Sequence, residues 1–271
     1  MYLEFDVGGS NMRIAVSSDN QSITQSKIVP LPQDFEQGIE TFKRVAKELG
    51  AEKIDALAGG IASPLDPEKT MLIASPHIPQ WVNKPLKAEL GKVFNCPVVL
   101  ENDSALGALG EAGFGAGKNH KIVAYIAIGT GVGGARVVNG ELDKNSLGFE
   151  PGHQIILPEG TLCNCGGKGH LETLVGGFYL ERAHKQKAEN IKDPEIWNEV
   201  AKYLAIGLNN TIVHWSPDII VLGGSVTNSI PVDKVNDYLK EFCTIFPNPP
   251  EVVKGTLEQD AGLYGALKLL S

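Results

Sequence analysis

Short apolar runs alternate along the chain with segments of helical periodicity. Runs rich in Val, Ile, Leu and Phe predict strands at residues 2–7, 12–17, 22–29, 54–62, 97–102, 121–129, 133–142 and 218–226. Residues 34–49 repeat apolar side chains at three- and four-residue spacing, which predicts an amphipathic helix. Further helices are expected at 104–113, 171–188, 195–215 and 261–270. Strands and helices that alternate in this way are typical of an α/β fold.

Two glycine turns occupy equivalent places in the pattern. The turns at 7–12 and 129–134 each join a strand to a hairpin partner near the start of a segment that continues with strands and helices. Asn139-Gly140, between two apolar runs, predicts another hairpin turn. The repeated order indicates a duplicated, two-lobed α/β architecture with a cleft between the lobes.

Composition and charge narrow the class of protein. The 271 residues are 42% hydrophobic, enough for a sizeable core, and 24 basic against 32 acidic residues give a net charge of −8. That balance argues against nucleic acid and anionic membranes as partners. Residues 1–10 have no basic segment typical of a signal peptide, and no apolar run is long enough for a membrane helix. With four dispersed or closely spaced cysteines, these features favour a cytoplasmic enzyme.

Glycine turns supply the first candidate chemistry. Asp6 is followed by Gly8, Gly9 and Ser10, where backbone N–H groups could face a phosphate and the carboxylate could orient Mg²⁺ through water. A hairpin turn with an incidental Asp is the alternative. GTGVGG at 129–134 is followed by a strand rather than a helix, so it fails as a dinucleotide fingerprint, and no P-loop motif is present. LGGSV at 222–226 is either a nucleotide-binding turn or a strand end.

Glu101-Asn102-Asp103 lies between a predicted strand and a predicted helix. Asp at a helix start is a common N-cap, which is one interpretation of Asp103. The other is functional, because open α/β sheets bind ligands at the carboxyl ends of their strands. A carboxylate there could accept a proton from a substrate hydroxyl.

A glycine-rich loop brings together residues typical of metal sites. His153 is followed by Cys163, Cys165 and His170, enough ligands for a closed tetrahedral zinc site that would stabilise a loop with little core of its own. The alternative is unrelated Cys and His residues in a loop.

Taken together and in order, these motifs resemble those of the ROK family of bacterial sugar kinases and sugar-responsive repressors, over the whole chain. DVGGSNMR at 6–13 is similar to that family's phosphate motif, IASPLD at 61–66 and PHIPQW at 76–81 to its sugar-side loops, and END at 101–103 to its catalytic segment. GTGVGG, the E-x-G-H motif at 150–153, the cysteine loop and LGG at 222–224 follow in the family's order.

The resemblance implies an actin-like ATPase (ribonuclease H-like) fold of two lobes that bind ATP, Mg²⁺ and a sugar. The first lobe would be 1–105 plus 258–271, and the second 106–257. Asp103 would be the general base, acting on the 6-OH of a hexose such as glucose or an N-acetylhexosamine. Expected sugar contacts are Ser63, His77, Asn102, Asp103, Glu150, His153 and Glu172. Expected nucleotide contacts are Asp6, Gly8, Gly9, Ser10, Thr130, Gly131, Gly223 and Gly224, and structural zinc would bind His153, Cys163, Cys165 and His170.

Three positions depart from the family's pattern. His170 replaces a cysteine of the zinc set, His77 replaces an Asn on the sugar side, and Ser63 replaces a Gly. The last two changes leave the sugar unassigned. The expected partners are a small sugar and ATP, in a homodimer. The alternatives are a catalytically silent sugar sensor, a polyphosphate-dependent kinase and a repressor, the last disfavoured by net charge and a first strand that starts at Tyr2.

Overall fold

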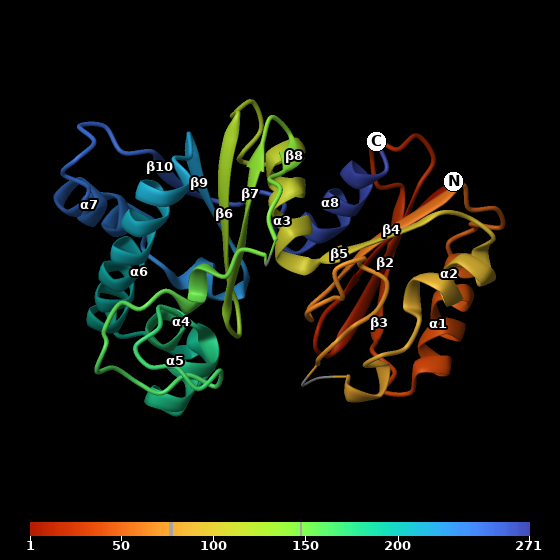
Figure 1. Cartoon of the computed structure of the whole chain (residues 1–271), viewed down its shortest axis with the longest axis horizontal. Coiled ribbons are helices and arrows are strands. Elements are labelled where there is room, and N and C mark those ends of the chain that lie inside the picture. Colours follow the sequence, from red (N-terminus) through yellow and green to blue (C-terminus); the bar gives the residue numbers. More distant parts are fainter. Residues whose placement is uncertain (76–77, 147) are drawn as a thin grey trace. The chain divides into compact units, whose positions relative to one another are not determined.

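The computed structural model describes residues 1–75, 78–146 and 148–271. The chain divides into a first unit, Met1–Gly113 with Asp260–Ser271, and a second unit, Phe114–Gln259 (Figure 1). Helices α3 (Asp103–Gly113) and α8 (Ala261–Leu269) pack closely within the first unit. The approach requires glycine at position 110, where a Cβ would lie 2.1 Å from the carbonyl oxygen of Ala261. A boundary after residue 105 would divide α3, and the structure keeps that helix whole.

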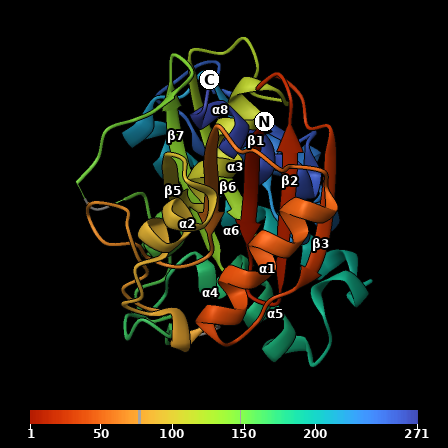
Figure 2. The same cartoon turned by 90° about the vertical axis from the view of Figure 1, so that its right-hand side faces the viewer.

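A mixed five-stranded sheet forms the first unit. Its order is β3-β2-β1-β4-β5. These strands span Gln25–Pro30, Asn11–Ser17, Tyr2–Val7, Ala56–Ile61 and Val98–Asn102. β1 pairs antiparallel with β2 and parallel with β4, which is parallel to β5. Helices α1 (Phe35–Glu48) and α2 (Leu86–Phe94) cover one face, and α3 and α8 cover the other (Figure 2).

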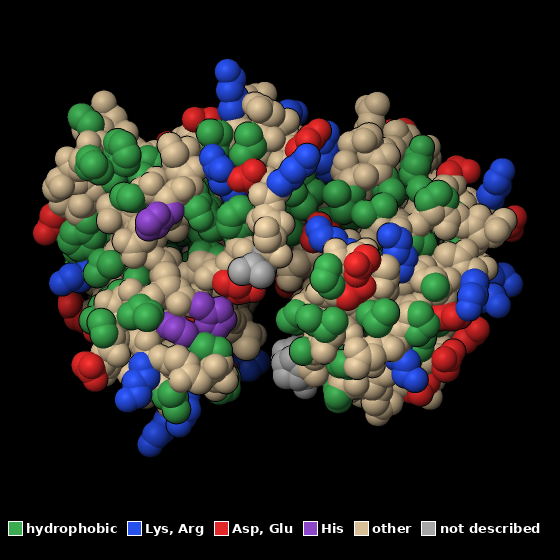
Figure 3. All heavy atoms as spheres, in the orientation of Figure 1, with side chains coloured by type: hydrophobic (Ala, Val, Ile, Leu, Met, Phe, Trp, Pro, Cys, Tyr) green, Lys and Arg blue, Asp and Glu red, His purple; other side chains and the backbone are tan. Residues whose placement is uncertain are grey.

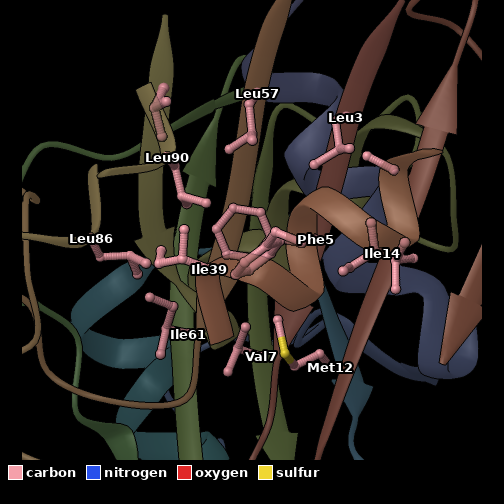
Figure 4. Close-up of a cluster of buried hydrophobic side chains, with 14 of the residues drawn as sticks. Leu3, Phe5, Val7, Met12, Ile14, Ile39, Leu57, Ile61, Leu86 and Leu90 are labelled. Carbon is pink, nitrogen blue, oxygen red and sulfur yellow. The ribbon is translucent and has the colours of Figure 1, made fainter. Parts of the chain in front are cut away.

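The alternation of β1 accounts for the core of this unit. Leu3, Phe5 and Val7 are fully buried and point toward α1 and α2 (Figure 4). The ring of Phe5 meets Phe42 edge to face, with ring centroids 4.9 Å apart. A Cβ on Gly59 would lie 2.3 Å from the Phe5 ring, so this strand position has room only for glycine. Glu4 and Asp6, at the intervening positions, face α3 and α8.

A second mixed sheet forms the second unit, in the order β10-β9-β6-β7-β8. These strands span Glu251–Lys254, Ile219–Gly223, Ile122–Ile128, Val132–Val138 and Glu141–Leu142. Its helices are α4 (Glu172–Val175), α5 (Gly177–His184), α6 (Pro194–Trp215) and α7 (Val232–Phe242). Buried residues of α6, including Leu204 and Leu208, share a core with Ile126 and Ile220 of the sheet.

The two sheets repeat one topology. In each, a hairpin (β1–β2, β6–β7) is extended by a third antiparallel strand, while two parallel strands follow on the other side of the first strand. The duplication expected from the glycine turns is therefore confirmed. The Asn139-Gly140 hairpin is confirmed as well, with φ of 53° and 81° at its two central residues.

One predicted helix is wrong. The segment 171–188 forms α4 and α5 rather than a single helix, because Gly176 between them is extended (φ −72°, ψ 142°). Short 3-10 turns occur at Pro79–Trp81, Pro151–His153, Ala188–Asn190, Ser225–Ser229 and Glu258–Asp260.

Neither the surface charges nor the helices of the described ranges point to a membrane-spanning protein. Acidic and basic side chains are interspersed on the face shown in Figure 3. Among the residues that the structure describes, no helix combines the length and hydropathy that crossing a membrane requires.

Candidate active site and metal cluster

Asp103 is the first residue of α3, at the carboxyl end of the parallel strand β5. The side chain that caps this helix is Asn102, whose Oδ1 accepts the backbone N–H of Ser104 at 3.0 Å and of Ala105 at 3.4 Å. Asp103 Oδ1 accepts the Ser104 N–H at 2.8 Å. Because Asn102 performs the capping, the position of Asp103 does not depend on a role as N-cap.

Asp6 lies on the same face of the sheet as Asp103. In the strand register Asp6 aligns with Gly60, and a Cβ on Gly60 would lie 3.3 Å from the Cα of Asp103. Burial and, to a smaller extent, the charge of Asp103 together raise the pKa of Asp6 to about 6, against the opposing charge of Arg13. Burial also raises the pKa of Asp103, against hydrogen bonds led by that from Ser104.

The turn after Asp6 exposes backbone donors. Gly8 donates its N–H to the carbonyl oxygen of Asn11 at 3.0 Å and closes the turn. The N–H groups of Gly9 and Ser10 bond to none of the described residues. Free adjacent N–H groups next to a carboxylate are the arrangement that phosphate and a hydrated cation require.

The equivalent turn of the second unit has the same character. Gly129 donates its N–H to the carbonyl oxygen of Gly131 at 3.0 Å, while the N–H groups of Thr130 and Gly131 make no hydrogen bond within the described part of the chain.

Gly223 and Gly224 have a packing role of their own. A Cβ on Gly223 would lie 2.0 Å from the Tyr125 hydroxyl oxygen, and Gly224 has φ of 87°.

Four candidate metal ligands converge in the second unit. Ligand atoms of His153, Cys163, Cys165 and His170 all lie within 4.8 Å of one another. His153 Nδ1 is 3.2 Å from His170 Nδ1 and 3.9 Å from Cys163 Sγ. Cys165 Sγ is 3.5 Å from His170 Nδ1. The spacing from 153 to 170 therefore closes into one cluster, as the sequence predicts.

These distances suit a tetrahedral zinc ion. Bond lengths of about 2.0–2.1 Å to nitrogen and about 2.3 Å to sulfur separate tetrahedral ligands by about 3.4 Å (N to N) and about 3.6 Å (N to S). The N–N distance of 3.2 Å and the N–S distances of 3.5 and 3.9 Å lie close to both values. Both imidazoles turn Nδ1 toward the cluster. The Cys2His2 donor set thus fits zinc without a third cysteine.

Glycine permits the approach of His170. A Cβ on Gly167 would lie 2.5 Å from His170 Cε1, and one on Gly169 would lie 1.5 Å from the carbonyl oxygen of Leu157. The glycines of the loop are needed to fold it around the cluster.

Glu172 contacts both the metal cluster and the glycine turn at 129–134. Its Oε2 accepts the Val132 N–H at 3.0 Å, and Cys163 Sγ lies 3.6 Å from its Oε1. A Cβ on Gly131 would lie 2.3 Å from Glu172 Oε2, so the absent side chain of Gly131 makes room for the carboxylate. Glu150, by contrast, is exposed and immediately precedes the short 3-10 turn Pro151–His153.

Two expected sugar contacts remain, Ser63 and His77, and the structure describes only Ser63. Ser63 is buried just after β4, with its N–H donated to the Ile61 carbonyl oxygen at 2.7 Å. His77 lies outside the described residues. The first unit thus holds Asp6, Gly8–Ser10, Ser63, Asn102 and Asp103. The second unit holds Thr130, Gly131, Glu150, His153, Glu172, Gly223, Gly224 and the metal cluster.

The sequence analysis gives no role of its own to either of two buried carboxylates: Glu101, named there only as part of the motif at 101–103, and Glu4. Glu101 is buried and forms an ion pair with Lys69, which is remote in sequence. Glu4 is fully buried, and neither of its carboxylate oxygens has a hydrogen-bond partner among the described residues. Burial raises the pKa of Glu4 to about 8. A Glu within an apolar strand was the only available signal for the second.

The chain is similar to known sugar kinases over nearly its whole length. The chain is 29% identical to a glucokinase of Thermotoga maritima, over 98% of this chain and 95% of the relative. It is 31% identical to a xylose repressor of Bacillus spizizenii, over 76% of this chain and 59% of the repressor. A ROK family glucokinase from Streptomyces griseus, solved in complex with glucose and AMPPNP, is 26% identical, with a TM-score of 0.82 over 99% of this chain and 98% of that one.

The fold and the family follow from these matches. The two α/β units with their repeated sheets have the actin-like ATPase fold of ROK sugar kinases. The model of the ROK family matches residues 2–271, so this chain belongs to the ROK family.

Proposed function

We propose that the protein is an ATP-dependent sugar kinase that transfers the γ-phosphoryl group of ATP to a hydroxyl of a hexose. The observation that carries the proposal is the partly buried Asp103 at the carboxyl end of β5, on the same face of the sheet as Asp6, which leads into a turn with free N–H groups. Similarity to glucokinases over nearly the full length supports the same activity. Phosphoryl transfer needs mainly positioning and charge neutralisation, which these groups supply.

Asp103 is the proposed general base. Its carboxylate would take the proton of the sugar 6-OH as that oxygen attacks the γ-phosphorus, and the bond from the γ-phosphorus to the bridging oxygen would break to release ADP. Burial raises the pKa of Asp103 toward the range in which a carboxylate can accept a proton efficiently. The Ser104 N–H holds the carboxylate in place.

Asp6 and the glycine turns are the proposed nucleotide contacts. The N–H groups of Gly9 and Ser10, and those of Thr130 and Gly131, have the free donors that phosphate oxygens accept. Asp6 offers a carboxylate for Mg²⁺ bound through water, and Mg²⁺ when bound would neutralise charge on the phosphates. Gly8, Gly223 and Gly224 are included in this proposal, although packing alone explains the last two.

The sugar hydroxyls are proposed to meet Ser63, His77, Asn102, Glu150, His153 and Glu172. His153 suits a double role, because its Nδ1 faces the metal cluster and its Nε2, which bonds to none of the described residues, could meet a hydroxyl. Zinc, when bound by His153, Cys163, Cys165 and His170, would hold the loop in shape. His153 and Glu172 would thereby be fixed relative to one another. The sugar is a hexose such as glucose, or an N-acetylhexosamine.

A transcriptional regulator is the second candidate, and the 31% identity to a xylose repressor favours it. The chain spans 59% of that repressor. A regulator that only senses sugar has no need of a base, so the carboxylate of Asp103 at the carboxyl end of β5 favours the kinase.

ADP release with Mg-ATP across a panel of sugars tests the proposal. The panel is glucose, mannose, fructose, allose, N-acetylglucosamine and N-acetylmannosamine. We expect ADP release that depends on one or two of these sugars. Zinc-loaded, folded protein that binds a sugar but releases no ADP with any of them would instead favour the sensor.

A further inference from the structure

The segment from Pro64 to Ile73 is a closely hydrogen-bonded loop of the first unit. Ile73 donates its N–H to the Pro64 carbonyl oxygen at 3.0 Å, and Leu65 and Leu72 form an antiparallel bridge. Asp66 accepts the Met71 N–H and the Thr70 hydroxyl, each at 2.8 Å. The loop is thus internally braced.

Lys69 lies at the tip of this loop in an unusual conformation. Its φ of 51° is in the left-handed region, which costs free energy for a residue with a Cβ. The hydrogen bond from Lys69 N–H to the Asp66 carbonyl oxygen, 2.9 Å long, helps hold it there. Strained backbone that its surroundings maintain is often tied to function.

The side chain of Lys69 forms an ion pair with Glu101. The Glu101 side chain is only 10% exposed, whereas that of Lys69 is 49% exposed. Within the described part of the chain, Lys69 is the sole cation paired with Glu101. A buried carboxylate left without its partner is strongly unfavourable.

Glu101 in turn bonds to the backbone of Asn102, one of the residues proposed to bind the sugar. Its Oε2 meets Lys69, and its Oε1 accepts the backbone N–H of Asn102 at 2.9 Å. Asn102 then caps α3, in which Asp103 is the first residue. A continuous set of contacts therefore connects Lys69 to the start of α3.

We propose that Lys69 is a positioning residue for sugar phosphorylation, which holds Glu101 and through it the peptide that presents Asn102 and Asp103. This inference rests on the proposed kinase function. Without Lys69, the Glu101 carboxylate must take up a proton or turn toward water. Either change weakens its bond to the Asn102 N–H. A small displacement of a reacting group is enough to lower the rate strongly.

The test compares Lys69→Met, Lys69→Arg and the control Lys84→Met. Lys84 is an exposed lysine that forms no ion pair with described residues, so its variant removes the same charge without the contact. Assays run well below the melting temperature. We expect Lys69→Met to lower kcat/KM for the sugar tenfold or more while the KM for ATP stays within twofold. Lys69→Arg, which can still pair with Glu101, should stay within threefold of wild type, and Lys84→Met should be unchanged.

Two further measurements separate the possible failures. Amide hydrogen exchange at Asn102, Ser104 and Ala105 should quicken in Lys69→Met but not in Lys84→Met, and this readout does not require activity. If Lys69→Met does not fold, Lys69→Met/Glu101→Gln removes the unpaired charge and should fold with the same loss of kcat/KM. A wild type inactive with every sugar would contradict the proposed function. An active wild type with Lys69→Met equal to it, in kcat/KM and in exchange, would overturn this inference.

Discussion

Asp6 and Asp103 lie on the same face of the first unit's sheet, where burial and then the charge of Asp103 raise the pKa of Asp6. Gly60 of β4 lies between their strands. A glycine there leaves no side chain to separate them. Carboxylates held near one another and away from water are typical of catalytic sites, where folding stability is sacrificed for reactivity.

Asp6→Asn should therefore stabilise the fold at neutral pH. The pKa of Asp6 rises from 3.8 to about 6 on folding, so its contribution to stability is fully present below pH 3.8 and is lost as the pH rises through about 6. We expect Asp6→Asn to gain about 1–3 kcal/mol in urea unfolding at pH 7.5. The gain should vanish near pH 3.5. A variant less stable than wild type at pH 7.5 would contradict the assigned electrostatics.

Glu4→Gln should have a larger effect, reached at higher pH. Glu4 has a pKa of 4.5 when unfolded and about 8 when folded, and its buried oxygens have no partners among the described residues. Wild-type stability should fall as the pH rises from 4.5 and level off only above about 8. At pH 9 the variant should exceed wild type by a few kcal/mol. If the difference in urea midpoint between Glu4→Gln and wild type is the same at pH 5 and at pH 9, Glu4 is not a buried, protonated group with a raised pKa.

His170→Ala should release the metal and destabilise the second unit. His170 is buried and supplies one of the four clustered ligand atoms, so its loss opens the site. We expect less than half the zinc content of wild type by elemental analysis, and a lower melting temperature. His170→Cys, which restores a ligand, should recover both. Native protein purified without chelators that contains no zinc, and whose melting is unaffected by EDTA, would remove zinc from the account.

Sequence patterns predicted most of the architecture because strand alternation and glycine turns are local signals. The hairpins, the duplicated order of strands and the convergence of His153 with His170 follow from short-range spacing. Helices α2 and α7 and strand β10 were missed. The segments of α2 and β10 are short, nine and four residues. Helix α7 does repeat apolar side chains at helical spacing, with Val235 and Leu239 buried, so its signal was present in the sequence. The break at Gly176 was missed because the apolar pattern continues through it.

Contacts between residues far apart in the chain could not be predicted from the sequence. The pairing of Lys69 with Glu101 depends on a loop returning to β5, and the facing of Asp6 and Asp103 depends on the register of three strands. That Asn102 is the residue whose side chain caps α3 could be established only from hydrogen-bond geometry.

Sugar-dependent ADP release by Asp103→Asn tests the account most directly. Because burial raises the pKa of Asp103, replacing it with Asn should leave the melting temperature at pH 7.5 equal to that of wild type or higher. We expect kcat to fall by a factor of 10² or more, as loss of a general base predicts, while sugar binding measured by calorimetry stays within about threefold. Turnover within a few-fold of wild type would contradict the assignment of Asp103 as the base.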